Sequence, residues 1–263
     1  MEILKALILG IVQGLTEFLP VSSSGHIELG IVLFNLDPSD DLTFSLIVHL
    51  ATVLSTILVF RNDILLILKN ISFKNWTFGN KFIWLVAISM VPIFIAGCFF
   101  KDQIEALYHG KIVMVGFMLW ITAALLLATK WVKKNDNEIK PFHAFLIGIS
   151  QALAVIPGIS RSGATISTGL LLGIKRETMA RFSFLMVLLP IIGASIFQIQ
   201  EINSTGQLVN VKWIPLLAAF VGAFLSGLFA CKAMIRLVKE GNIYWFAIYC
   251  FIIGGLAIAT QWV

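Results

Sequence analysis

Residues 19–25 of the chain read Leu-Pro-Val-Ser-Ser-Ser-Gly, and residues 157–163 read Pro-Gly-Ile-Ser-Arg-Ser-Gly. Each stretch interrupts an apolar segment near its middle, at Pro and Gly residues that end a helix. The runs that follow, Ile27–Leu36 and Ala164–Ile174, have too few residues to cross a bilayer alone. Each break therefore predicts either one interrupted crossing or a re-entrant pair of half-helices that enters the membrane and returns.

The composition around these breaks is that of an integral membrane protein, because 59% of the residues are hydrophobic and only 13% are charged. A helix of about 20 apolar residues crosses a hydrocarbon core of ~30 Å. Six stretches approach this length: Phe44–Phe60, Phe82–Phe100, Ile112–Trp131, Phe182–Ile199, Trp213–Ala230 and Ile243–Val263. The basic residues behind the net charge of +5 gather between these stretches, which indicates cytoplasmic loops and not a nucleic-acid-binding surface.

The two breaks belong to an internal repeat. An offset of 138 positions aligns Leu9–Leu15 with Ile147–Leu153, and it also pairs Ser22 with Ser160. The same offset pairs Ser24-Gly25 with Ser162-Gly163. A single membrane domain over residues 1–263 is therefore expected to contain two copies of one unit, about 1–132 and about 141–263.

The positions of the Lys and Arg residues separate the two arrangements of the breaks. With both breaks re-entrant, 14 of these residues fall on one side of the membrane and four on the other; with both crossing fully, the count is roughly ten against eight. The first arrangement obeys the positive-inside rule. We therefore expect an all-α protein of six transmembrane helices plus two re-entrant broken-helix pairs, with inverted topology. Both termini would face outward, and the breaks would meet around a polar cavity.

Both breaks have the residues of an anion site. A Ser-rich turn precedes each half-helix, so hydroxyl groups cap its start and free backbone N–H groups lie behind them. Two such N-termini with Arg161 at one of them suit a pyrophosphate. The residues expected to bind it are Gln13, Ser22, Ser24, Gly25, Ser160, Ser162, Gly163 and Thr165.

Glu17 is the main candidate for chemistry. It follows Gln13 by four residues and so shares a helix face with it, and an ionisable residue inside a membrane segment indicates function. The alternative is that Glu17 only caps the half-helix or pairs with Arg161. Ser23 aligns with Arg161 in the repeat, so one copy offers a hydroxyl and the other a cation, which favours catalysis over passive binding. His49, which lies in a predicted span with no motif around it, is assigned to packing.

The two motifs also carry a family resemblance. Glu-Phe-Leu-Pro-Val-Ser-Ser-Ser-Gly-His at 17–26, together with Pro-Gly-Ile-Ser-Arg-Ser-Gly-Ala-Thr at 157–165, resembles the paired signatures of the undecaprenyl-diphosphate phosphatase family of the bacitracin-resistance type. The resemblance extends over the whole chain in length, repeat and order of spans. It implies hydrolysis of undecaprenyl pyrophosphate to the monophosphate outside the cytoplasm, at the bacterial inner membrane. That activity would recycle the lipid carrier for peptidoglycan synthesis and give bacitracin resistance.

The resemblance and the spacing together assign roles. Glu17 would act as general base or as ligand to Mg²⁺ or Ca²⁺, Ser23 as nucleophile or phosphate-positioning group, and Arg161 as the cation that neutralises the phosphoryl oxygens. His26 would activate Ser23 or protonate the leaving phosphate, unless it is only a hydrogen-bonded packing group. Gln13 stands where many family members have Glu, and an amide is the weaker metal ligand, so Glu17 is the expected ligand.

Some alternatives stay open at this stage. A transporter or flippase for polyprenyl phosphates would also use inverted repeats and broken helices. Attack by Ser23 through a phosphoserine and direct attack by water are both compatible with the residues. The expected partners are the lipid pyrophosphate and membrane lipid, without nucleic acid or organic cofactor, and a homodimer is left open. The three cysteines are scattered through apolar spans and indicate no metal cluster.

Overall fold

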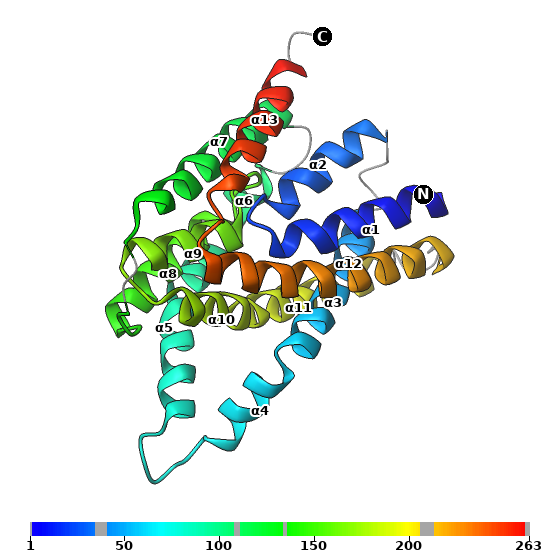
Figure 1. Ribbon diagram of the computed structural model, residues 1–263. Coiled ribbons are helices and arrows are strands. Elements are labelled where there is room, and N and C mark those ends of the chain that lie inside the picture. The colour runs from blue at the N-terminus through cyan, green and yellow to red at the C-terminus, as the bar shows by residue number, and fades with distance from the viewer. Residues whose placement is uncertain (1, 35–40, 108–110, 134–135, 206–212, 261–263) are drawn as a thin grey trace.

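The structure, a computed structural model, describes residues 2–34, 41–107, 111–133, 136–205 and 213–260. Within these ranges the regular structure is helical, apart from one isolated bridge between Asn137 and Ile174. The helices in chain order (Figure 1) are α1 Ile3–Phe18, α2 Ser23–Leu33, α3 Asp41–Val59, α4 Arg61–Lys69, α5 Phe78–Phe99, α6 Lys101–Glu105, α7 Ile112–Ala128, the short 3₁₀ turn η2 Thr129–Trp131, α8 Pro141–Leu153, α9 Arg161–Leu171, α10 Arg176–Met186, α11 Leu188–Thr205, α12 Trp213–Glu240 and α13 Trp245–Ala259. The predicted all-α class is confirmed.

Four of the expected spans are long, apolar helices. They are Phe78–Phe99, Ile112–Trp131, Arg176–Gln200 and Trp213–Glu240, each with at least 18 suitable residues. The stretch predicted over Phe44–Phe60 forms α3 and turns into α4 with a bend of 69°, so the pair together makes a fifth candidate. The last predicted span, Ile243–Val263, contains the 15-residue α13, and its final three residues lie outside the described ranges. The described residues therefore contain four to five candidate spans.

Each predicted break separates two helices. Four residues, Leu19 to Ser22, separate the end of α1 from the start of α2 at Ser23. In the second copy α8 ends at Leu153 and α9 begins at Arg161. Both α2 and α9 have 11 residues, about 16 Å of helix, so neither can cross a membrane alone. Because α2 packs against α1 and α9 against α8, each pair is a helical hairpin.

The hairpins pack against long helices that are distant in sequence. Helix α1 lies along α12, as Figure 1 shows, and α8 lies along α5. A Cβ atom at Gly10 would collide with the carbonyl of Ala219, and one at Gly148 would collide with the carbonyl of Ser89. Small residues at such crossings let helix backbones touch, which replaces the hydrophobic driving force that is absent between helices in lipid. Gly10 and Gly148 are 138 positions apart, so the two hairpins use the same residue for the same contact.

Aromatic side chains fill the space behind the first hairpin. Phe18 lies next to Glu17 in the chain and packs on Phe184 with ring centroids 5.9 Å apart, and Phe60 packs on the same ring at 6.0 Å. All three are almost completely buried. This cluster joins α1, α10 and the end of α3, and so fixes the position of the C-terminal end of α1, where Glu17 lies.

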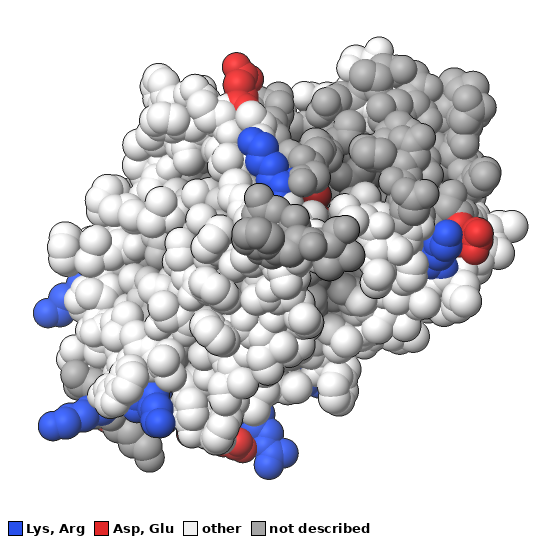
Figure 2. All heavy atoms as spheres, turned by 90° about the horizontal axis from the view of Figure 1, so that it is seen from above, with Lys and Arg blue, Asp and Glu red and all other residues white. Residues whose placement is uncertain are grey.

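The outer surface exposes more large apolar side chains than the surface of a water-soluble protein does. Phe94, Phe197 and Phe229 lie on three different candidate spans, and each is more than 70% exposed. In Figure 2 uncharged residues predominate on the visible face and charged side chains are few and separated. Large exposed apolar patches mark membrane or protein contacts. With the candidate spans, this surface indicates a multi-pass membrane protein.

Candidate active site

The two breaks have the same local hydrogen bonds. Ser22 caps α2 by accepting from the backbone N–H of Gly25 at 3.3 Å, and Ser160 caps α9 by accepting from that of Gly163 at 3.1 Å. In each break the capping hydroxyl is 3.3 Å from a second one, that of Ser24 or Ser162. Capping leaves further N–H groups of the first turn available, which makes each N-terminus attractive to anions.

The first break has a strained backbone. Ser22 has a φ of 70° in the region that favours glycine, whereas its counterpart Ser160 has a φ of −73°. A non-glycine residue in this region costs of order 1–3 kcal/mol and is held there by its surroundings. The strain turns the chain sharply enough to put Ser23 at the first position of α2.

The breaks touch one another, as predicted. The hydroxyl of Ser162 donates to the carbonyl of Leu19 at 3.2 Å. The packing is close as well, since a Cβ atom at Gly25 would lie 3.2 Å from the Cα of Gly158. Thr122 of α7 holds the second break from behind: its hydroxyl accepts from the N–H of Ser160 and donates to the carbonyl of Gly158, both at 3.0 Å. Residues about 140 positions apart therefore share one site.

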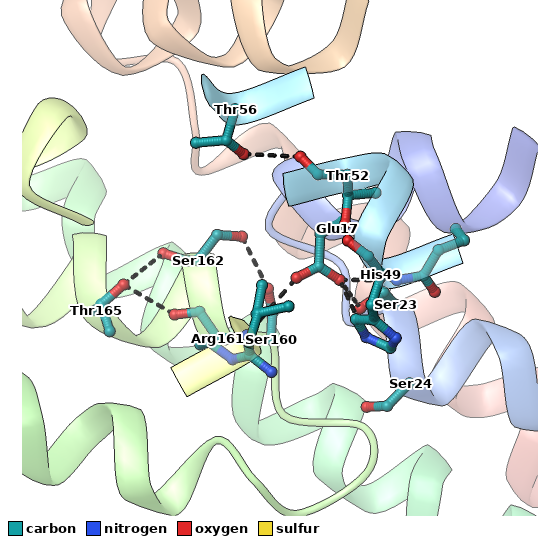
Figure 3. Close-up of polar contacts among 12 residues, drawn as sticks. Glu17, Ser23, Ser24, His49, Thr52, Thr56, Ser160, Arg161, Ser162 and Thr165 are labelled. Atoms are coloured by element: carbon teal, nitrogen blue, oxygen red, sulfur yellow. Dashed lines mark hydrogen bonds and ion pairs between the residues drawn. The ribbon is translucent and has the colours of Figure 1, made fainter. Parts of the chain in front are cut away.

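Glu17 lies at the centre of this site (Figure 3). Its Oε2 accepts from Gln13 Nε2 at 2.9 Å and from Ser23 Oγ at 2.7 Å. Its Oε1 is 3.7 Å from Arg161 Nη1. The carboxylate side chain is only 8% exposed. One buried carboxylate thus joins a hydroxyl of the first hairpin to the cation of the second, and the expected one-sided arrangement of Gln13 and Glu17 is present.

Arg161 has unused hydrogen-bonding capacity. It is the first residue of α9, and its Nε and Nη1 atoms are buried without a hydrogen-bond partner among the described residues. Its backbone carbonyl accepts from Thr165 at 2.9 Å, and the same hydroxyl contacts Ser183 of α10 at 2.7 Å. Buried N–H donors of a guanidinium are costly to leave unpaired, so this arrangement suits an anion with several oxygen atoms.

His26 contacts other groups than the Ser23 hydroxyl that it was expected to activate. Its Nδ1 donates to the carbonyl of Ser22 at 2.8 Å, because a carbonyl only accepts, and its Nε2 is 2.8 Å from the hydroxyl of Tyr249 on α13. The two rings stack with centroids 5.6 Å apart. Among the contacts of the described residues none joins His26 to Ser23. The structure therefore connects His26 to Tyr249 and to the turn that presents Ser23, not to the Ser23 hydroxyl.

His49 belongs to the site, and the packing role assigned to it from the sequence is wrong. Its Nδ1 donates to the carbonyl of Ser45 at 2.8 Å, which directs Nε2 toward Glu17 Oε2 at 3.9 Å. Thr52 and Thr56 follow it on the same face of α3 and line a small cavity beside Glu17. A polar stripe at positions 49, 52 and 56 of an apolar span was the available signal, since polar residues inside membrane helices usually face a bundle interior.

A small cavity completes the site. Its volume is about 20 Å³, and it is lined by residues of α1, α3, α8, α9, α10 and α11: Glu17, Phe18, Thr52, Thr56, Gln151, Arg161, Ser162, Thr165, Ser183, Phe184, Val187 and Ile191. Gln151 and Ser183 were not expected here from the sequence. Glu17 and Arg161 line the cavity, whereas Ser23 and Gln13, which contact Glu17 Oε2, are not among its lining residues.

The donor set bears on the expected metal ion. Among the residues that the structure describes, no cluster of three or more His, Cys, Asp or Glu side chains could hold a metal on its own. Within the described part of the chain, Glu17 is the one carboxylate that contacts Ser23 and Arg161, and Gln13 contributes an amide. Mg²⁺ in phosphate sites is often bound by one or two carboxylates and the substrate's phosphate oxygens. The residues present fit a cation that is bound partly by Glu17 and partly by phosphate oxygens of the substrate.

Comparison with known proteins identifies the family of the chain. The family described as bacitracin resistance protein BacA matches residues 6–256. The chain is 47% identical over 262 residues to a protein of Christiangramia forsetii named undecaprenyl-diphosphatase, which covers 98% of each chain. Proteins of the same name in Bacteroides fragilis and Halothermothrix orenii are 44% and 36% identical, over 99% and 98% of each chain respectively. The matched range covers nearly the whole chain and contains both breaks, and the chain therefore belongs to the bacitracin resistance protein BacA family.

Proposed function

We propose that this protein hydrolyses undecaprenyl pyrophosphate to undecaprenyl phosphate and inorganic phosphate, and so recycles the lipid carrier for peptidoglycan synthesis and gives bacitracin resistance. One observation carries the proposal: Glu17 holds the Ser23 hydroxyl at 2.7 Å and Arg161 at 3.7 Å, between two helix N-termini. The name shared by relatives at 36–47% identity agrees with it. A carrier needs to bind its substrate, but it does not need a hydroxyl paired with a buried base.

The electrostatics suit a phosphoryl group. Arg161 offers planar N–H donors that match phosphate oxygens, and the N-termini of α2 and α9 add partial positive charge. Phosphoryl transfer depends mostly on positioning and on neutralising the charge of the three equatorial oxygens. A buried site strengthens these interactions relative to water. The combination favours the transition state over the ground state as charge spreads over the transferred group.

Two routes use these residues. In the first, Ser23 Oγ bonds to the terminal phosphorus, its proton passes to Glu17, and the bond from phosphorus to the bridging oxygen breaks; water then hydrolyses the phosphoserine. In the second, Glu17 takes a proton from water, and the water oxygen bonds to the same phosphorus as the bridging bond breaks. In both, undecaprenyl phosphate leaves with the bridging oxygen. His26, which contacts Ser22 and Tyr249, would orient the Ser23 turn.

A divalent cation, Mg²⁺ or Ca²⁺, is part of the proposal. Glu17 would be its protein ligand, with Gln13 as a weaker second donor, and phosphate oxygens would complete its shell. When bound, such an ion neutralises charge on the pyrophosphate.

The test of the function is release of inorganic phosphate by the protein purified in detergent. With undecaprenyl pyrophosphate as substrate we expect steady release in Mg²⁺ or Ca²⁺ and a loss of most activity in excess EDTA, because the cation shares the charge of the substrate. The measurement is a colorimetric phosphate assay, with undecaprenyl phosphate as the control substrate. No release under any divalent-cation condition would favour the polyprenyl-phosphate transporter instead.

The proposed architecture is an inverted repeat of six transmembrane helices and two re-entrant hairpins in the bacterial inner membrane. Ion pairs among the basic loops support it: Lys81 bonds Glu138 at 2.7 Å, Arg181 bonds Asp63 at 2.7 Å, and Lys239 bonds Glu177 at 2.8 Å. The 14 basic residues expected in the cytoplasm form four groups, at positions 61–81, 130–140, 175–181 and 232–239, and each pair joins two of these regions. The reciprocal packing of α1 on α12 and of α8 on α5 is what a twofold axis between the copies would produce. The termini and the opening of the site would then lie outside.

This orientation can be tested by labelling introduced cysteines in whole cells. Cys98 is exposed and is first replaced by Ser, whereas Cys231 and Cys250 are buried. Ser204→Cys, beyond the candidate span that ends at Gln200, should react with a membrane-impermeant maleimide in intact cells. Asn75→Cys, exposed between α4 and α5, should react only after permeabilisation. The opposite labelling pattern would reverse the proposed orientation.

A further inference from the structure

Gln151 is a buried polar residue to which nothing above assigns a role. It lies near the C-terminal end of α8 and is completely buried. Neither its Nε2 nor its Oε1 has a hydrogen-bond partner among the described residues. A buried amide without partners destabilises the fold by the full cost of its desolvation, so a side chain kept for packing alone would be expected to be apolar.

The repeat provides an internal comparison. Gln151 aligns with Gln13 at the offset of 138 positions, and Gln13 donates to Glu17 Oε2, four residues on, at 2.9 Å. Four residues after Gln151 the chain has Val155, which offers no carboxylate. The same amide at the equivalent place in the second hairpin therefore lacks the acceptor that satisfies the first.

The surroundings of Gln151 show what could satisfy it. It lines the cavity of about 20 Å³ together with Arg161, whose Nε and Nη1 atoms also lack hydrogen-bond partners among the described residues, although Nη1 is 3.7 Å from Glu17 Oε1. An oxygen atom of the size of a water molecule needs a cavity volume of about 10–15 Å³. The cavity thus accommodates one oxygen atom in contact with N–H donors, and the Arg161 charge makes an anionic oxygen the favoured occupant.

We propose that Gln151 binds a phosphoryl oxygen of the pyrophosphate jointly with Arg161, which makes it a substrate-binding residue. The amide Nε2–H donates to the oxygen that enters the cavity, beside Arg161 and Glu17. The pseudo-equivalent glutamines then differ in function: Gln13 holds the base, and Gln151 holds the substrate. This inference rests on the proposed function and adds a residue to its site.

The test compares Gln151→Met with the unmodified protein. Met has a similar shape but offers no amide donor. We expect the KM for undecaprenyl pyrophosphate to rise by about 10- to 100-fold, the range of a hydrogen bond to a charged group, with a smaller change in kcat. We also expect inorganic pyrophosphate to raise the melting temperature of the unmodified protein, and this increase to be largely lost in Gln151→Met. Without ligand, the variant should be at least as thermostable as the unmodified protein, because a buried amide without partners has been removed.

Ser167→Ala is the matched control. Ser167 is also completely buried, its hydroxyl also lacks a partner among the described residues, and it does not line the cavity. It should leave KM and the pyrophosphate-induced shift unchanged. Gln151→Glu, which places a carboxylate beside the bound anion, should weaken binding more than Gln151→Met does.

An unchanged KM together with a lower thermostability of Gln151→Met would overturn the inference. A purely structural amide, bonded to a trapped water, predicts that Gln151→Met is less thermostable and has an unchanged KM. If the unmodified protein releases phosphate and Gln151→Met has the same KM within twofold, this inference fails and the proposed function stands. If the unmodified protein releases none, the proposed function itself fails.

Discussion

Arg161→Ala should reduce phosphate release from undecaprenyl pyrophosphate by about 10³-fold or more, the lower end of what a transition-state arginine contributes in phosphoryl transfer. The substitution removes the cation 3.7 Å from Glu17 together with two buried donors that have no other partner among the described residues. Charge that accumulates on the transferred group would then lack its main counter-charge. The measurement is single-turnover phosphate release at saturating substrate.

Arg161→Lys separates charge from geometry. Lys keeps the positive charge but has no planar set of donors, so its activity should lie between those of Arg161→Ala and the unmodified protein. Both variants need a folding control, because removing one member of a buried ion pair can destabilise a protein by about 3–5 kcal/mol. Thermal unfolding and gel filtration in detergent provide it. A folded Arg161→Ala protein with near-normal release would contradict the role of Arg161.

Ser23→Ala should lower kcat by ~10²-fold or more if the Ser23 hydroxyl attacks phosphorus. The hydroxyl donates to Glu17 Oε2 at 2.7 Å, the distance of a nucleophile held by its base. Ser23 is the first residue of α2, and the cap is made by Ser22, so the change should leave the half-helix intact. Steady-state phosphate release, with rapid-quench detection of a phosphoserine, checks the result. Turnover close to normal would instead indicate direct attack by water.

A double-mutant cycle with Glu17→Gln gives the matching control. If Ser23 and Glu17 act as one unit, the double variant should be scarcely slower than the worse single variant, because each change alone disables the unit. Additive losses would show that Glu17 acts mainly through Arg161 or through a cation. Glu17→Gln preserves the shape of the side chain, which limits the structural disturbance at the centre of the site.

Local interactions of the site were accessible from the sequence. The caps at Ser22 and Ser160 connect residues three positions apart, and the contact of Gln13 with Glu17 connects residues four positions apart. Helix geometry alone determines which side chains meet at these spacings. The sequence also predicted the spans where the apolar run was long, as in α5 and α7. It did not predict the bend of 69° between α3 and α4.

Contacts between helices that are distant in the sequence could not be predicted from it. His49 reaches Glu17 only because α3 packs beside α1, and no sequence spacing relates the two residues. Tyr249 and His26 are separated by 223 positions, so nothing near His26 predicts that its Nε2 contacts the Tyr249 hydroxyl. Gln151 occupies the same position before the second break as Gln13 does before the first. Its lack of a hydrogen-bond partner among the described residues appears only when α8, α9 and α10 are assembled.

The amino-acid sequence by itself determined that the chain enters a membrane, that two Ser-rich breaks each begin a half-helix, and that a carboxylate and an arginine lie at those breaks. Composition and hydrogen bonds within one helical turn suffice for these features, because they depend only on neighbours in the chain. The tertiary structure decided which oxygen of Glu17 meets Ser23 and which faces Arg161, and which polar side chains are left for a ligand. Those relations depend on close helix packing at residues such as Gly10 and Gly148, which brings together groups more than 100 positions apart.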